Sequence, residues 1–434
     1  MEILSLGEKI KRRRKELNMT LKDLAGERIT PGQISLVESG RSNPSMDLLE
    51  YLANTLDTSV EYLMESEKTQ AEKICLFFEQ TAERYLLEDN VLKAEQHIES
   101  ALYYAEKYNL EYRKAKNLYL RAEVYLKQDE FALAQQFFLA ANALFIKTGS
   151  NVDIVNTYLK AGKISLRAKA YHSSNSYLKE AEKVYVSNKL TEDTLLGQIY
   201  YYLSKTYFLM EDIRQAINFA FLAKEEFEKI YDRKRYAEAL ALLSDEYNKA
   251  GDLENAITYS KKSLDIFKEL QQEKDIATIE NSLGRLFYEF DNIEESFSHY
   301  EKAKKMRIDN RDDKLVETLI DICENYIKLK NIEKCNETLL AIKEILKNDD
   351  IERILDYNYL CYRVASLEDN KEKAEFILLD MIHIADKYGL EKRKAEISIT
   401  LGKFYLELKR DYESAKYLDK GIESLKKIGI IKKW

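Results

Sequence analysis

Side chains that could carry out chemistry are scattered through this chain of 434 residues. The four cysteines are far apart and show no CxxC spacing: Cys75, Cys323, Cys335 and Cys361. The four histidines are isolated as well: His97, His172, His299 and His383. Zinc sites and redox pairs need such residues at short, regular spacings. No nucleophile motif, metal cluster or glycine-rich phosphate loop is present either, so we expect no catalysis, no metal and no cofactor. The cysteines are interpreted as reduced core thiols, and the histidines as helix-surface or packing residues.

Basic charge is concentrated at the N-terminus. Residues 1–45 carry nine basic and six acidic side chains, residues 46–65 carry five acidic and no basic ones, and the whole chain has a net charge of −8. The pattern places these basic side chains on one face of a first helix: Lys9, Lys11, Arg12, Arg13 and Lys15. The opposite face holds Leu6, Ile10 and Leu17. A local basic face on an acidic chain is typical of nucleic-acid contact. A solvated helix face is the alternative for the run 11–15.

Five short helices must position these residues. Thr20 is suited to cap a second helix, because its side chain can accept a hydrogen bond from a backbone N–H of the first turn. Thr30 and Pro31 mark the start of a third helix. Proline is tolerated at the first helical position, because the backbone N–H that it lacks would have no partner within the helix there. Apolar spacing predicts a fourth helix over 48–56 and a fifth over 60–63. We therefore expect a small helical domain at residues 1–65.

This segment resembles the phage-repressor or Xre type of helix-turn-helix domain, whose ISxxExGxxxP core is present between Ile34 and Pro44. In that family the third helix enters the major groove of DNA. The resemblance implies that the following residues contact base edges: Thr30, Gln33, Ser35 and Leu36. It also implies phosphate contacts by Arg41 and Asn43, and a partly buried pair of Arg14 with Glu38 that holds the first helix against the third.

Two features depart from the family pattern. The family commonly has glutamine directly after the capping threonine, where this chain has Leu21. Pro31 and Gly32 have no hydrogen-bonding side chains, so the third helix presents few groups that could read bases. Gln33 has two open interpretations: it reads a base, or it only closes the capping box that begins at Thr30.

The rest of the chain contains a repeat of about 40 residues. Small residues recur at separations of 39 to 42: Ala94, Ala134, Ser174, Ala216, Ala256, Ser296, Cys335, Ala374 and Ala415. In most units an aromatic residue lies nine positions earlier, and both prolines of the chain precede the array. The spacing suits two closely packed helices with an aromatic wedge, and it resembles a long form of the tetratricopeptide repeat (TPR). We expect an all-α protein in which residues 66–434 form about nine stacked helix pairs.

In this repeat family, four positions of each first helix (the A helix) face a concave surface. The residues considered at these positions are Asn156, Lys163, Gln198, Tyr201, Lys205, Phe208, Glu238, Asp245, Asn248, Asn281, Arg285, Tyr288, Tyr359 and Arg363. Amides and cations are the groups needed to hold the backbone and terminal carboxylate of an extended peptide. We therefore predict peptide contacts at Asn156, Lys163, Tyr201, Lys205, Asp245, Asn248, Asn281, Arg285, Tyr288 and Arg363. For each of them, a solvated or intra-array polar residue is the alternative.

A helix-turn-helix domain followed by such an array resembles the RRNPP group of peptide-pheromone receptors from Gram-positive bacteria. The resemblance implies a cytoplasmic, homodimeric transcription regulator that binds an inverted-repeat DNA operator and a short signalling peptide used in quorum sensing. No signal peptide or membrane span is expected, because no stretch of 18 apolar residues occurs. The alternative from another class is a protein-interaction scaffold, or a phosphatase-like array, that acts on a response-regulator partner, with DNA binding secondary.

Overall fold

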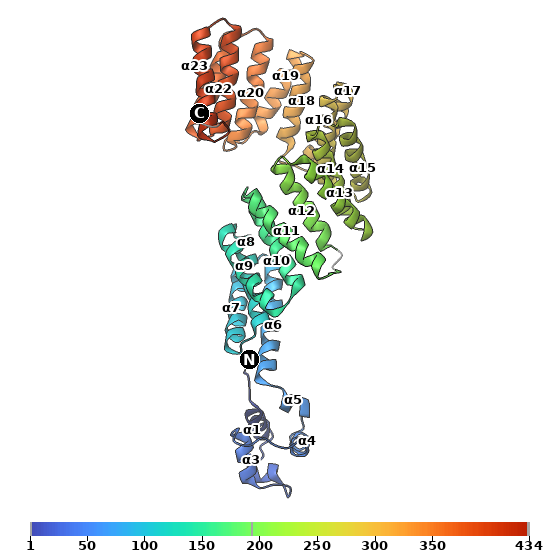
Figure 1. Cartoon of the computed structure of the whole chain (residues 1–434), viewed down its shortest axis with the longest axis vertical. Coiled ribbons are helices and arrows are strands. Elements are labelled where there is room, and N and C mark those ends of the chain that lie inside the picture. Colours follow the sequence, from blue (N-terminus) through green and yellow to red (C-terminus); the bar gives the residue numbers. More distant parts are fainter. Residues whose placement is uncertain (1, 192–193, 432–434) are drawn as a thin grey trace. The chain divides into compact units, whose positions relative to one another are not determined.

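The computed structural model describes residues 2–191 and 194–431, and these residues form helices and no strand. The all-α expectation is therefore confirmed. Grouped by contacts, the chain forms two compact units, Met1–Glu226 and Phe227–Trp434 (Figure 1). The domain boundary expected at residues 65 and 66 stays a prediction. No helix in the described ranges is long and apolar enough to cross a membrane.

The first five helices form a small domain with its own core. They are α1 (Leu6–Glu16), α2 (Leu21–Ala25), α3 (Pro31–Glu38), α4 (Met46–Thr55) and α5 (Val60–Met64). Each contributes buried side chains to one cluster: Ile10, Leu24, Ala25, Ile34, Val37, Leu52, Ala53, Leu56 and Leu63. Capping boxes that start at Ser5, Thr20 and Thr30 begin α1, α2 and α3. The caps expected at Thr20 and Thr30 are thereby confirmed.

Within the described residues, eighteen further helices follow as nine pairs. The A helices are α6 (Glu67–Leu87), α8 (Glu111–Lys127), α10 (Asn151–Arg167), α12 (Leu195–Leu209), α14 (Arg233–Lys249), α16 (Glu273–Glu289), α18 (Leu315–Lys328), α20 (Ile351–Leu367) and α22 (Glu391–Glu407). The B helices are α7 (Val91–Lys107), α9 (Phe131–Thr148), α11 (Tyr171–Ser187), α13 (Ile213–Lys229), α15 (Leu253–Glu269), α17 (Ile293–Asp309), α19 (Ile332–Ile345), α21 (Lys371–Lys387) and α23 (Asp411–Lys427). Within each unit several successive A helices contact each other: α6 with α8 and α10 with α12 in the first unit, and α16 with α18 and α18 with α20 in the second. In each unit, the A helices together present one surface, which we call the A-helix wall of that unit.

The two helices of a pair approach most closely at residues twelve positions apart. Where the B helix carries serine, its hydroxyl donates to a carbonyl of the A helix, as Ser296 Oγ does to Gly284 O at 2.7 Å. The same bond joins Ser174 to Gly162 at 3.0 Å and Ser414 to Gly402 at 2.9 Å. A Cβ added to Gly284 would lie 2.4 Å from the ring of Tyr300. Small residues are therefore a steric requirement here, as their spacing predicts.

Aromatic wedges lie beside this contact, also at a separation of twelve. The ring pairs are Tyr85 with His97, Tyr125 with Phe137, Tyr207 with Phe219, Tyr247 with Tyr259, Phe287 with His299, and Tyr405 with Tyr417, with centroids 5.3 to 5.6 Å apart. Two of the four histidines, His97 and His299, are thus packing residues. His299 Nδ1 also lies 2.6 Å from a carboxylate oxygen of the buried Glu280.

The last repeat corrects the expected spacing by one residue. The sequence pattern placed the small residue of this unit at Ala415, but Ala415 is exposed and Ser414 is buried against Gly402. Ser414 lies nine positions after Tyr405, as in the other units, and seven positions before the buried Gly421. The position expected at Ala415 was wrong because two neighbouring small residues cannot be told apart without knowing which one faces the A helix.

We predict that Gly284→Ala destabilises the second unit by about 1 to 3 kcal/mol, the usual effect of overpacking a buried contact. The reason is that the added methyl group meets the ring of Tyr300, which is itself buried. Urea denaturation followed by circular dichroism measures the change. Gly32→Ala is the matched control, since a Cβ there would meet only Thr30 Oγ1 at 3.8 Å and alanine favours the helix. Equal stability of Gly284→Ala and the unmodified chain would contradict this account.

Candidate nucleic-acid and peptide interfaces

Helix α3 presents one exposed face. Ile34 and Val37 are buried in the domain core and hold the helix in place. The residues that the resemblance assigns to base edges are all exposed: Thr30, Gln33, Ser35 and Leu36. Arg41 and Asn43 are exposed in the segment that follows the helix. The structure thus brings the six residues to the surface of one helix and the segment after it, and their contacts with DNA stay a prediction.

Gln33 closes the capping box at the start of α3. Its side-chain oxygen accepts a hydrogen bond from Thr30 N at 3.0 Å, and Thr30 Oγ1 accepts one from Gln33 N at 3.3 Å. The capping interpretation therefore describes its side-chain oxygen. Because a carboxamide also carries an NH₂ group that can donate, the capping bond leaves the base-reading interpretation open.

Arg14 and Glu38 join α1 to the end of α3. Arg14 Nε donates to one carboxylate oxygen of Glu38 at 2.6 Å and Nη2 donates to the other at 2.9 Å. A third donor, Arg14 Nη1, reaches Met19 O at 2.8 Å. The hydrogen bond to Glu38 raises the pKa of Arg14. This bidentate ion pair between mostly buried groups holds α3 against α1, in the place that the resemblance implies.

Lys9 does not lie on the basic surface where the sequence pattern placed it. Its side chain is buried, with 1% exposed, and Nζ donates to Tyr62 O and Glu65 O at 2.7 Å each. Desolvation lowers the pKa of Lys9. The interpretation was wrong because two carbonyls at the end of α5, more than 50 residues away, satisfy the ammonium group. Arg13 is partly engaged too, since its Nε donates to Leu56 O at 2.9 Å.

The helix-turn-helix domain is also tied to the first repeat. Leu4 N donates to Gln70 Oε1 at 3.1 Å, and Gln70 Nε2 donates back to Leu4 O at 2.8 Å. Ile3 packs against a cluster that includes Ala71 and Cys75 of α6. Sequence reasoning missed these contacts, because a lone glutamine and an N-terminal isoleucine carry no recognisable pattern.

The A-helix wall of the first unit carries four of the predicted peptide-contact residues: Asn156, Lys163, Tyr201 and Lys205. All four are partly buried on α10 and α12. Lys163 Nζ donates to Gln198 Oε1 at 3.0 Å and lies 4.5 Å from the ring centroid of Tyr202. Lys205 Nζ lies 4.7 Å from the ring centroid of Tyr201. These cations are therefore held over aromatic rings within the array.

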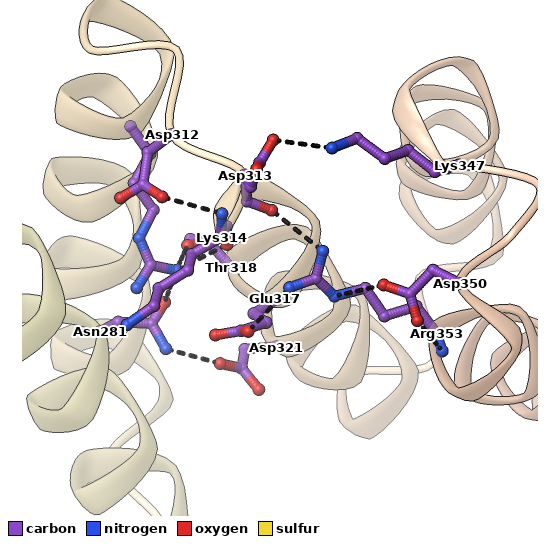
Figure 2. A network of polar contacts seen from close by, with 11 residues as sticks. Asn281, Asp312, Asp313, Lys314, Glu317, Thr318, Asp321, Lys347, Asp350 and Arg353 are labelled. Carbon is purple, nitrogen blue, oxygen red and sulfur yellow. Dashed lines mark hydrogen bonds and ion pairs between the residues drawn. The ribbon is translucent and has the colours of Figure 1, made fainter. Parts of the chain in front are cut away.

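The A-helix wall of the second unit carries the other six: Asp245, Asn248, Asn281, Arg285, Tyr288 and Arg363. Asn281 Nδ2 and Arg285 Nε both donate to Asp321 Oδ2, each at 2.8 Å. Figure 2 shows Asn281 pointing to Asp321 across the space between α16 and α18. Burial raises the pKa of Asp321, and the two donors offset part of this effect. Asn281 is only 3% exposed, so its removal should also lower the stability of the array.

Acidic partners on this wall were missed by the sequence reasoning. Asp321 binds Arg285, Glu324 binds Arg363, and Glu317 binds Arg353 at 3.1 Å. Each pair joins neighbouring A helices, and its members are 36 to 39 positions apart. Opposite charges separated by slightly less than one repeat are the signal that could have revealed them.

Asn248 differs from its neighbours on the wall. Its side-chain oxygen is buried and accepts no hydrogen bond in the described chain. Buried acceptors are nearly always paired, because an unpaired one costs roughly 1 to 3 kcal/mol. The side-chain oxygen of Asn248 is therefore a hydrogen-bond acceptor that the array itself leaves unused.

Comparisons with known proteins agree with this architecture. A helix-turn-helix family model matches residues 10–63, and a tetratricopeptide repeat model matches residues 236–309. The transcriptional activator NprA of Geobacillus stearothermophilus is 25% identical over 223 residues, which are 50% of this chain and 55% of the relative. The chain thus spans about half the length of that relative.

Two solved structures share the fold over most of their length. The apo form of RapI has a TM-score of 0.64 at 16% identity, with 82% of this chain and 98% of that chain covered. The apo form of the quorum sensor NprR from B. thuringiensis has a TM-score of 0.60 at 14% identity, with 82% and 99% covered. The chain combines a helix-turn-helix domain with a TPR array, and in this architecture it resembles the RRNPP-type regulators. Helix α3 lies within the residues matched by the helix-turn-helix model, and the helix pairs α6–α23 form the TPR array.

Gln33→Ala separates the two interpretations of this residue. If Gln33 reads a base, discrimination at one base pair falls by about 1 to 3 kcal/mol. If it only caps α3, the domain loses about 1 kcal/mol of stability and sequence discrimination is unchanged. Competition binding with duplexes that differ at single positions, combined with thermal melting, measures both quantities. A variant with unchanged discrimination and unchanged melting would contradict both interpretations.

Proposed function

We propose that this chain is a cytoplasmic transcription regulator whose helix-turn-helix domain binds an inverted-repeat DNA operator as a homodimer, and whose TPR array binds a short signalling peptide that controls DNA binding or activity. The observation that supports the proposal best is the capped and exposed α3 within a matched helix-turn-helix domain, in the same chain as a TPR array. The chain's likeness to NprA, described as a transcriptional activator, supports the same function. No catalytic step is assigned to the chain.

DNA binding would use α3 and the segment after it. Helix α3 would enter the major groove, with Thr30, Gln33, Ser35 and Leu36 at base edges. Arg41 and Asn43 would contact phosphates, which supply most of the affinity and little of the specificity. Selection of binding duplexes from a random pool, followed by footprinting, tests this part. An inverted repeat bound by two chains supports the homodimer, whereas one chain on a single half-site contradicts it.

Peptide binding would use the A-helix wall of the second unit. Asn248, Asn281 and Arg285 lie on the neighbouring A helices α14 and α16, and the side-chain oxygen of Asn248 accepts no hydrogen bond in the described chain. Extended peptides expose donors and acceptors that side-chain amides can match. By linkage, a peptide that favours the DNA-binding state must bind more tightly when operator DNA is present. Calorimetric titration of short peptides with free carboxyl termini, with and without operator, tests this coupling.

A scaffold that acts on a response-regulator partner is the alternative function. The likeness of the fold to RapI and to NprR fits both functions, because a shared fold alone does not specify the ligand. Specific retention of operator DNA by the purified chain supports the regulator. Stable co-purification with a receiver domain, in a chain that retains no operator, would favour the scaffold.

Arg41→Ala is expected to weaken binding to all DNA sequences by a similar factor. Loss of one phosphate contact should reduce the slope of log affinity against log salt concentration by about one unit. Binding measured at several salt concentrations gives the slope. The control is Arg167→Ala, which removes an exposed arginine at the end of α10. An unchanged slope in Arg41→Ala would remove Arg41 from the proposed interface.

Asn248→Ala is expected to lower peptide affinity by about tenfold, which corresponds to one hydrogen bond of about 1.4 kcal/mol. Stability should not fall, because the side-chain oxygen has no partner to lose. Asn281→Ala should lower both affinity and stability, because Asn281 is buried and bonded to Asp321. Titration calorimetry and thermal melting distinguish the two variants. Undiminished peptide affinity in both would exclude this part of the wall as the binding site.

A further inference from the structure

The seventh helix pair is shorter than its neighbours at one end. Helices α18 and α19 have 14 residues each, whereas α16, α17, α20 and α21 have 17. The shortening leaves a pocket of about 270 Å³ where α17 and α19 end and α18 and α20 begin. The apolar residues that line it are Ile308, Leu315, Val316, Ile345 and Leu346. This volume suits an amino-acid-sized ligand and is too small for a peptide of several residues.

A buried arginine lines this pocket without an acidic partner. Arg307 is 2% exposed, and its Nη1 donates to Lys314 O at 2.8 Å and to Thr318 Oγ1 at 2.5 Å. No ion pair of the described chain includes Arg307, and its Nε has no acceptor. Desolvation lowers the pKa of Arg307. A buried cation whose hydrogen bonds all go to neutral acceptors is costly, and the charges of Asp312, Glu317 and Asp321 offset only part of the lost hydration of Arg307.

The other charged groups of the pocket are mostly satisfied. Lys347 pairs with Asp313 at 3.2 Å, and Arg353 pairs with Glu317 at 3.1 Å, as Figure 2 shows. Asp312 accepts the backbone N–H of Lys314 at 2.9 Å and is the one acidic lining residue without a cationic partner in the described chain. Arg311 is exposed, lines the same pocket and makes no ion pair there either. Arg307 and Arg311 therefore line the pocket without an ion pair in the described chain, next to its apolar lining residues.

We propose that this pocket binds the anion of an amino-acid-sized aliphatic acid. Its carboxylate group pairs with Arg307 and Arg311, and its alkyl group packs on the apolar lining residues. Guanidinium groups match the two oxygens of a carboxylate, and a carboxylate would supply the negative charge that Arg307 lacks. The apolar lining residues favour an anion with a branched aliphatic group over a fully polar anion such as phosphate. A free organic acid and the C-terminal residue of a polypeptide share this chemistry.

The pocket is connected to the A-helix wall of the second unit. Arg307 Nη1 lies 3.5 Å from Asn281 Oδ1, and Asn281 donates to Asp321 on the wall. A ligand that reorients Arg307 would therefore act on the side chain that also holds Asp321. The site itself is independent of the proposed peptide and DNA functions, so its test needs neither ligand.

Titration calorimetry of the full chain with 4-methylpentanoate tests the proposal. We expect saturable binding of one molecule per chain, and no binding of the uncharged methyl ester. Arg311→Gln should weaken binding about tenfold, and Ile308→Glu, which places a carboxylate at an exposed position of the pocket rim, should abolish it. Arg167→Gln is the matched control and should bind like the unmodified chain. Melting temperatures show whether each variant is folded.

Further probes distinguish the sources of the carboxylate and the competing anion. A tripeptide that ends in leucine, compared with its C-terminal amide, tests a polypeptide terminus: binding of the acid alone supports the proposal with a chain end as ligand. Inorganic phosphate that binds as tightly as 4-methylpentanoate would overturn the assignment to an aliphatic carboxylate. Absence of saturable binding for both carboxylates, or undiminished affinity in both Arg311→Gln and Ile308→Glu, would overturn the site.

Discussion

The close approach of the two helices in each repeat is the contact on which the array depends. At this contact a B-helix residue faces the A-helix residue twelve positions earlier, and the space holds a small side chain or a hydroxyl that bonds to the facing carbonyl. Close contact lets the aromatic wedge beside it pack face to face with its partner, as Tyr247 does with Tyr259. Each pair then presents its A helix to the next pair. The polar A-helix wall is a consequence of this repeated steric constraint.

The connections between the helices follow another local rule. Most described helices of the array are followed, two positions after their last residue, by a residue with positive φ, and many of these residues are not glycine, such as Asp89, Lys169 and Gln271. A left-handed residue allows the chain to leave the helix and satisfy its last carbonyls. Non-glycine residues adopt this conformation at some cost, which the packing of the helix pair must balance. The turns therefore carry little sequence signal, and the 40-residue period of small residues carries most of it.

Features that depend on residues close in sequence could be predicted, and features that depend on distant partners could not. The caps at Thr20 and Thr30 need only the next three residues, and the pairing of helices needs only a spacing of twelve. Lys9 was misplaced because its acceptors come from another helix of the domain. The family resemblance predicted the pair of Arg14 and Glu38, which composition alone does not reveal. The sequence analysis did not compare charges slightly less than one repeat apart, which would have pointed to Asp321, so the wall looked richer in available cations than it is.

The ion pairs of the wall change what a ligand must do there. Arg285 already donates to Asp321, so a peptide carboxylate that takes this guanidinium replaces one charged hydrogen bond with another and leaves the buried Asp321 with only the amide of Asn281 as donor. Such an exchange yields little net free energy, because an unpaired buried charge is costly. Affinity on this wall must therefore come mainly from groups that the array leaves unpaired, of which Asn248 is one, and from apolar contact. The paired cations would then contribute to specificity. A ligand that has no carboxylate cannot replace Asp321 at Arg285, so it gains no binding free energy from separating this ion pair.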